Sequence, residues 1–319
     1  MDSNMPLNSH PSAGAKRTPV TGKEQGVPDA THPADPSGGG LIAFIRRRPL
    51  TSYFLLTYAL AWLGWTPFVL SESGLGVLRF QADPLLLLGS LGPCAAGFIM
   101  AAITGGKPGV RDLLRRLIQW RVGWQWYLFV LVVVPGVPLL GFLVLPGVAK
   151  TLYLPSVQFA LQFVLFFLQF LLTVNLIQAL EEEPGWRGFA LPRLQQRYGP
   201  LLGTLILGSL WAGYHLPLFL TTAFADRTPF GFAVFLLASI AISLVLTWVY
   251  NSARGSVLLT ILAHAAIIAS GIASGAMNLF PADILEKDTY PAITIGLGAL
   301  VVLLIVVTRG RLGLASKPE

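Results

Sequence analysis

Eight apolar stretches of membrane-spanning length constrain the fold of this chain more than any other feature. They cover approximately residues 51–70, 84–104, 125–147, 157–180, 201–221, 230–250, 256–276 and 292–308. An α-helix needs about 20 apolar residues to cross a bilayer, and it satisfies its own backbone hydrogen bonds there. Charged residues make up 12% of the chain, against about 25% in soluble domains. The sequence therefore predicts an all-α membrane protein with about eight transmembrane helices in the cell membrane.

The basic residues are divided unevenly between the two sides of this predicted bundle. With the N-terminus placed in the cytoplasm, the opposite side holds only Arg79, Lys150, Arg227 and Lys287 of the 22 basic residues. Cytoplasmic loops of membrane proteins carry an excess of Lys and Arg. We therefore predict a multi-pass protein with both termini cytoplasmic and the lipid bilayer as its environment. The net charge of +7 then reflects topology, and no nucleic-acid partner is predicted.

Composition divides the chain into four predicted regions. Residues 1–40 are rich in Pro, Gly, Ser, Thr and Ala without an apolar run, which predicts a disordered cytoplasmic tail. Residues 41–156 should form N-terminal membrane helices, with an amphipathic helix lying on the membrane surface at 109–122. Residues 277–319 should hold the last span and a cytoplasmic C-terminus. The chemistry-bearing residues fall in 157–276, which contains spans four to seven.

An acidic run follows the fourth apolar stretch: Glu181, Glu182 and Glu183 precede Pro184, and Arg187 comes soon after. Ionisable residues are expensive in membranes and usually serve a site. Pro184 should break or bend the helix. Glu183 and Arg187, four residues apart, can pair across that bend, which leaves Glu182 free as a general base. The alternative is a charge cluster that merely ends the helix at the interface.

Two histidines, His215 and His264, lie inside later apolar stretches. A histidine in a membrane helix often serves only a helix–helix hydrogen bond. Together with Glu182, however, the two can activate a water directly or hold a metal ion such as zinc. The residues alone leave metal dependence open.

The depths of these residues conflict in a bundle of straight, upright helices. Glu182 is predicted near the inner end of its span, whereas His215 lies 15 residues after Pro200, roughly 22 Å along a helix at 1.5 Å per residue. We therefore expect a wet cavity that descends to the acidic residues, because water also makes buried acids tolerable.

Three segments of this region resemble the CPBP family, also called the Abi family. They are EEPGWRGFALPRL, then Trp211 separated by three residues from His215, and then His264 after NSARGSVLLTILA. This family contains the CAAX-type prenyl-protein proteases and bacteriocin-processing proteins, and the resemblance covers about residues 157–276. It implies an intramembrane endopeptidase, described in the family both as a metalloprotease and as a metal-free glutamate enzyme. Its substrates would be membrane-associated or of the prenyl or leader-peptide type.

The resemblance also implies roles for individual residues. Glu182 and His215 would activate the attacking water, and His264 would stabilise the oxyanion. If the protein is metal-dependent, all three would be ligands, with zinc as the cofactor. Glu183 and Arg187 would support the site structurally, and Trp211 would pack around it.

One position departs from the family pattern. Four residues after His264 the family commonly has Asn, whereas this chain has Ile268, which cannot donate to an oxyanion. Asn175 lies two helical turns before Glu182, where it can either substitute as donor or form an ordinary interhelical hydrogen bond. The departure keeps open a non-catalytic membrane scaffold or an immunity protein on the same fold. A transporter is the remaining alternative, because broken helices and intramembrane charge also suit one.

Overall fold

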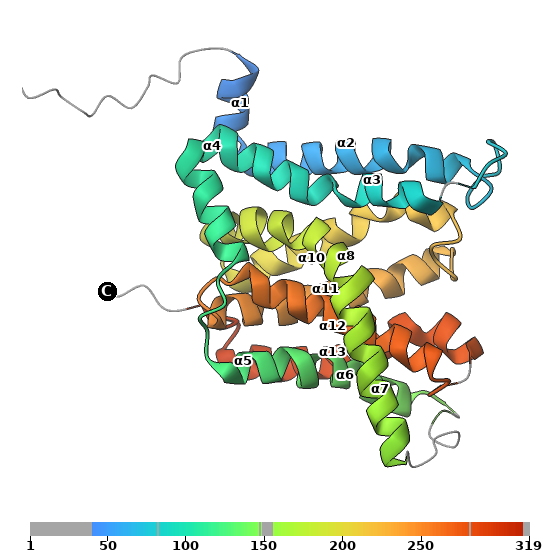
Figure 1. The fold of residues 1–319 in the computed structure, drawn as a ribbon. Coiled ribbons are helices and arrows are strands. Elements are labelled where there is room, and N and C mark those ends of the chain that lie inside the picture. Colours follow the sequence, from blue (N-terminus) through green and yellow to red (C-terminus); the bar gives the residue numbers. More distant parts are fainter. Residues whose placement is uncertain (1–39, 82, 147, 149–155, 281, 315–319) are drawn as a thin grey trace, which may run out of the picture. The chain divides into compact units, whose positions relative to one another are not determined.

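The computed structural model describes residues 40–314, with gaps at 82, 147, 149–155 and 281. The predicted tail lies outside the described residues as far as residue 39, as do Lys150 and the last five residues. Throughout the described part of the chain, the regular structure is helical (Figure 1). The predicted all-α fold class is therefore confirmed.

Eight helical stretches among the described residues are long and apolar enough to cross a membrane, as the sequence predicts. They are Pro49–Leu70, Leu86–Leu117, Trp124–Val144, Val157–Tyr198, Pro200–Leu220, Pro229–Ser252, Val257–Ala276 and Lys287–Thr308. The longest, Val157–Tyr198, contains the acidic run.

The first two spans form a helical pair that lines one side of the cavity described below. A short helix, α1 (Leu41–Arg47), precedes α2 (Pro49–Leu70), which packs against α3 (Leu86–Ser90) and α4 (Gly92–Leu117). Within α4 the backbone leaves helical geometry at Gly106, where φ is +58°, a value that favours glycine.

The segment after this kink overlaps the predicted surface helix at 109–122. It is helical as far as Leu117. Its apolar side chains do not share one environment, because Leu113 is buried whereas Leu114 and Ile118 are exposed. The Leu113 side chain lies so close to Gly188 that a Cβ at position 188 would clash with it.

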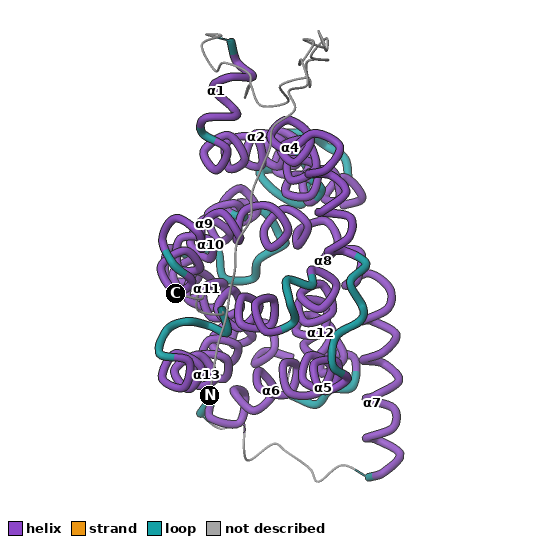
Figure 2. The backbone as a smooth tube through the Cα atoms, turned by 90° about the vertical axis from the view of Figure 1, so that its left-hand side faces the viewer, coloured by secondary structure: helices purple, strands orange, loops and turns teal. Residues whose placement is uncertain are grey.

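The later spans surround a central helix, α12 (Val257–Ala276), whose side chains are the most buried of the eight. Figure 2 shows α12 within a ring of neighbouring helices. It packs against α6 (Val134–Val144), α7 (Val157–Phe170), α8 (Leu176–Glu183) and α11 (Pro229–Ser252). Outside the fourth span, the other elements are η1 (Asp83–Leu85), α5 (Trp124–Leu128), η2 (Phe129–Val133), α10 (Pro200–Tyr214), η6 (Leu216–Leu220) and α13 (Ala282–Thr308).

The fourth span runs past Pro184 without breaking, so the predicted break there is wrong. After α8, the chain continues through the π-helical segment η5 (Pro184–Ala190) into α9 (Leu191–Tyr198). A π turn is wider than an α turn and bonds residues five apart, so the chain absorbs a proline without leaving helical geometry. The non-helical residue is Thr173, in the π segment η4 (Leu171–Asn175).

This continuity also corrects the predicted depth of the acids. Glu182 lies within a helical run of 42 residues, which ends only at Gly199, where φ is +77°. Glu182 is thus followed by four more turns of helix rather than standing near the end of its span. It therefore lies beside His215, at the far end of α10, whose Nε2 is 3.8 Å from its Oε1.

The predicted orientation can be tested by labelling cysteines in intact cells. In a Cys94→Ala background, which removes the natural cysteine, we expect Ala223→Cys to react with a membrane-impermeant maleimide. Lys107→Cys should react only after permeabilisation, because Lys107 belongs to the basic side. Both positions are exposed. The reverse pattern would show that the bundle is inserted the other way round.

Candidate functional site

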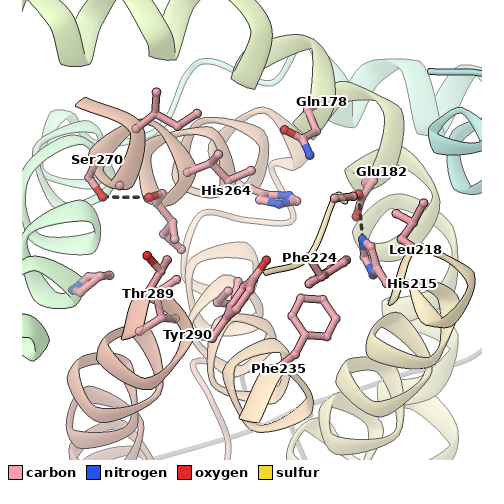
Figure 3. Close-up of a pocket in the computed structure, with 18 of the residues that line it drawn as sticks. Gln178, Glu182, His215, Leu218, Phe224, Phe235, His264, Ser270, Thr289 and Tyr290 are labelled. Carbon is pink, nitrogen blue, oxygen red and sulfur yellow. Dashed lines mark hydrogen bonds and ion pairs between the residues drawn. The ribbon is translucent and has the colours of Figure 1, made fainter. Parts of the chain in front are cut away.

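A cavity of about 670 Å³ lies among the helices. Glu182, Trp211, His215 and His264 all line it, together with Gln178. Figure 3 shows Glu182 and Gln178 on α8, His215 at the end of α10 and His264 on α12 around the cavity. The structure therefore brings together the three residues on which the predicted chemistry depends. It also contains a cavity at these residues, as expected, whereas the water expected in it stays a prediction.

The cavity extends toward one end of the bundle. Its lining includes Leu86 beside the start of α3, Phe142 near the end of α6 and Leu285 in the first turn of α13. Arg121 precedes α5 and Arg309 follows α13, at the opposite ends of the same spans. The cavity thus extends from the middle of the bundle toward the side that the predicted orientation places away from the cytoplasm.

The Glu182 carboxylate is held by two tryptophans. Its Oε2 atom accepts hydrogen bonds from Nε1 of Trp211 at 2.5 Å and from Nε1 of Trp186 at 3.2 Å. An indole N–H can only donate, so Oε2 is the acceptor in both contacts. The Oε1 atom is left to face the cavity.

His215 stands beside that free oxygen. It caps the C-terminus of α10, and its Nδ1 lies 2.9 Å from the backbone oxygen of Trp211. Because a carbonyl can only accept, Nδ1 carries the hydrogen and Nε2 of the neutral ring has a free lone pair. This Nε2 lies 3.8 Å from Oε1 of Glu182, so two hydrogen-bond acceptors face each other across a short gap.

Glu183 forms a second, deeper network. Its Oε1 accepts from Arg187 NH1 at 2.8 Å and lies 2.9 Å from His264 Nδ1. Arg187 also donates to the hydroxyl of Ser243 on α11 at 3.0 Å. The Glu183 and Arg187 side chains are both 0% exposed. The predicted Glu183–Arg187 pair is therefore present, and it also orients His264, which the sequence had grouped with Glu182 instead.

Trp211 joins the two networks rather than only packing around the site. Its N–H binds Glu182, while Arg187 lies over its ring at 5.2 Å. The His264 ring meets it edge-on, with 5.3 Å between centroids. One side chain thus fixes the position of the Glu182 carboxylate and contacts both partners of Glu183.

Trp186 was not identified from the sequence, although a signal was available. It lies four residues after Glu182, and this is the same spacing that pairs Glu183 with Arg187. Residues four apart share a helical face. Each of the two acids therefore has a donor at the same offset within the run.

Asn175 does not line the cavity, and neither bond considered for it, to an oxyanion or to another helix, is observed. Its Nδ2 donates to the backbone oxygen of Phe170, five residues earlier on the same helix, at 3.0 Å. This bond belongs to the irregular turn around Thr173, where the backbone leaves carbonyl groups to be satisfied. Ile268, by contrast, does line the cavity.

Among the described residues, no three His, Cys, Asp or Glu side chains gather as a metal-binding group. In the observed arrangement, Glu182 Oε2 is engaged by indole N–H groups and His264 Nδ1 by Glu183. The set Glu182, His215 and His264 does not converge as ligands here. Zinc stays a prediction, and the steps derived below do not use a metal.

Comparisons with known proteins show what this part of the chain is similar to. Residues 162–270 match the family described as type II CAAX prenyl endopeptidase Rce1-like. That range contains Glu182, His215 and His264. The chain is also 26% identical over 227 residues to CAAX prenyl protease 2 of Methanococcus maripaludis, covering 66% of this chain and 80% of that protein.

Removing Arg187 should destabilise the fold, because the buried Glu183 carboxylate would lose its arginine partner and keep only the contact with His264. We expect Arg187→Met to lower the free energy of unfolding in mixed micelles by about 3–5 kcal/mol. The matched control is Arg115→Met, in which an exposed arginine on α4 is replaced with an expected change within about 0.5 kcal/mol. Equal effects of the two substitutions would contradict a structural role for the pair.

Proposed function

The chain belongs to the CPBP family, and we propose that it is an intramembrane endopeptidase in which Glu182 and His215 activate the attacking water. The family match and the relative from Methanococcus maripaludis indicate an endopeptidase activity of the CAAX prenyl type. The eight apolar helices are consistent with a multi-pass membrane protein. The residues that perform the reaction are our assignment.

The observation that carries this proposal is the 3.8 Å gap between Glu182 Oε1 and His215 Nε2. Both atoms accept hydrogen bonds, so they cannot bond to each other without a proton between them. A water molecule about 2.8 Å from each atom can donate one hydrogen to each. The oxygen of that water then presents its lone pairs toward the cavity, where a peptide carbonyl would lie.

The proposed reaction needs only the residues around this gap. Glu182 takes a proton from the water as its oxygen attacks the carbonyl carbon of the scissile peptide bond. The tetrahedral intermediate then collapses, and the leaving amine receives the proton from Glu182. The two indole N–H groups hold the carboxylate in place throughout, because they bind the oxygen that does not transfer the proton.

His264 is proposed to stabilise the negative charge of the intermediate. Figure 3 shows its ring extending into the cavity near Glu182. Glu183 binds Nδ1, so Nε2 is the nitrogen available to substrate. When Nε2 also carries a proton, it donates to the developing oxyanion. Glu183 and Arg187 are then positioning residues that act through His264.

The walls of the cavity favour a largely apolar substrate. Phe224, Phe235, Ile267, Ile268 and Leu285 are among the lining residues. Pockets of several hundred Å³ with mainly apolar walls and a few converging polar groups are typical of sites for apolar ligands. We propose membrane-associated peptides as substrates. Prenylated C-terminal peptides, as in the name of the Methanococcus relative, and leader-type peptides both belong to this class.

The decisive test compares membrane peptides from cells that express the wild type or Glu182→Gln. Loss of the general base should lower cleavage by about 10²–10⁴-fold. Glu181→Gln is the matched control, because Glu181 lies in the same turn and is buried but does not line the cavity. We expect this control to retain cleavage and both variants to fold and express normally.

Identical peptide profiles for wild type and Glu182→Gln would contradict the protease proposal. If a cellular phenotype then persisted in Glu182→Ala, the protein would act as a scaffold. Substrate flux into liposomes that survives Glu182→Gln would instead indicate a transporter.

A further inference from the structure

We propose that Gln178 is a further catalytic residue, whose side-chain amide donates a second hydrogen bond to the oxyanion beside His264. This rests on the proposed function, because an oxyanion forms only if a carbonyl is attacked. Gln178 carries no charge and belongs to none of the three family-like segments, so it does not stand out in the sequence.

Gln178 stands on the same helix as the proposed general base. It lies four residues before Glu182 on α8, and residues four apart occupy one face of a helix. It lines the same cavity as Glu182 and His264. Figure 3 shows its side chain reaching from α8 toward the His264 ring, on the side where Glu182 enters.

Most other polar hydrogens at the cavity wall are already used. The hydroxyl groups of Ser90, Ser270 and Thr289 each donate to a backbone carbonyl three or four residues earlier on their own helices. The Trp211 N–H donates to Glu182. A buried hydroxyl that already satisfies a backbone carbonyl gives up that bond if it turns to a substrate.

Two side-chain donors at the cavity remain: the amide of Gln178 and the hydroxyl of Tyr290. Within the described part of the chain, neither has a side-chain hydrogen-bond partner. Tyr290 comes from α13 and packs against Phe224 and Phe235, with ring centroids 5.8 Å and 5.0 Å away. Gln178 instead shares a helix face with Glu182, and for this reason we assign the second hydrogen bond to it.

The position of Ile268 explains why such a donor is needed. Ile268 lies one turn after His264 on α12 and lines the cavity, where its aliphatic side chain cannot donate a hydrogen bond. His264 is therefore the one proposed hydrogen-bond donor to the oxyanion from α12. Gln178 faces His264 from α8, so the two donors would approach the oxyanion from opposite helices.

The test uses a fluorogenic form of a peptide that the wild type cleaves in the membrane-peptide comparison. With purified full-length protein, Gln178→Leu should lower kcat by about 10²–10³-fold with little change in KM, because an oxyanion donor acts only in the transition state. Gln162→Leu is the control. It makes the same change at an exposed glutamine of α7 that does not line the cavity, and we expect wild-type kinetics.

A rescue experiment separates donation from packing. In the Gln178→Leu background, Ile268→Asn places a new amide one turn after His264 and should restore kcat by about tenfold or more. A structural role for Gln178 would not be rescued from another helix.

Two outcomes would overturn the proposal: a kcat for Gln178→Leu within about threefold of wild type, or no recovery in the double variant. Tyr290→Phe is measured in parallel, and a large loss there with none in Gln178→Leu would assign the second donor to Tyr290. Glu182→Gln is included as a reference. If Glu182→Gln is inactive while Gln178→Leu is fully active, only the Gln178 proposal fails, whereas an active Glu182→Gln contradicts the proposed function itself.

Discussion

The buried ion pair between Glu183 and Arg187 is the interaction on which the rest of the site depends. Two opposite charges with no exposure to solvent are tolerable only when each has close partners, because the cost of removing them from water is several kcal/mol per ion. Here those partners come from different helices: His264 from α12 and Ser243 from α11. The pair therefore ties the fourth, sixth and seventh spans together at one level of the bundle.

Because Glu183 forms this ion pair, the neighbouring Glu182 carboxylate is available to act as a general base. Successive residues of a helix point about 100° apart at 3.6 residues per turn, so Glu182 faces the cavity while Glu183 faces its cationic partners. Trp211 lies between the two networks and contacts both. Trp186 and Arg187 lie in the π-helical segment that begins at Pro184, and each donates to the acid four residues before it.

The sequence predicted the residues of the site better than the backbone that holds them. Glu182, His215 and His264 could be identified because charge and imidazole stand out in apolar stretches, and all three line one cavity. The predicted break at Pro184 was wrong because proline rules assume α-helical geometry, and whether a π turn replaces it depends on packing. Asn175 was misassigned for a related reason: the irregular turn at Thr173, which uses its amide, has no clear signal in the sequence.

By itself, the sequence determined that this is a helical membrane protein with eight spans. It also determined which charged and imidazole side chains stand out within or beside the apolar stretches. The length of an apolar stretch and the free-energy cost of burying a charge depend on the residues alone, so both can be inferred without coordinates. Only the tertiary structure decided which acid faces which partner. It set His264 against Glu183, left His215 3.8 Å from Glu182 and brought Gln178 to the same cavity. These contacts depend on how helices far apart in the sequence are rotated and packed against one another, and that packing depends on all their contacting side chains together.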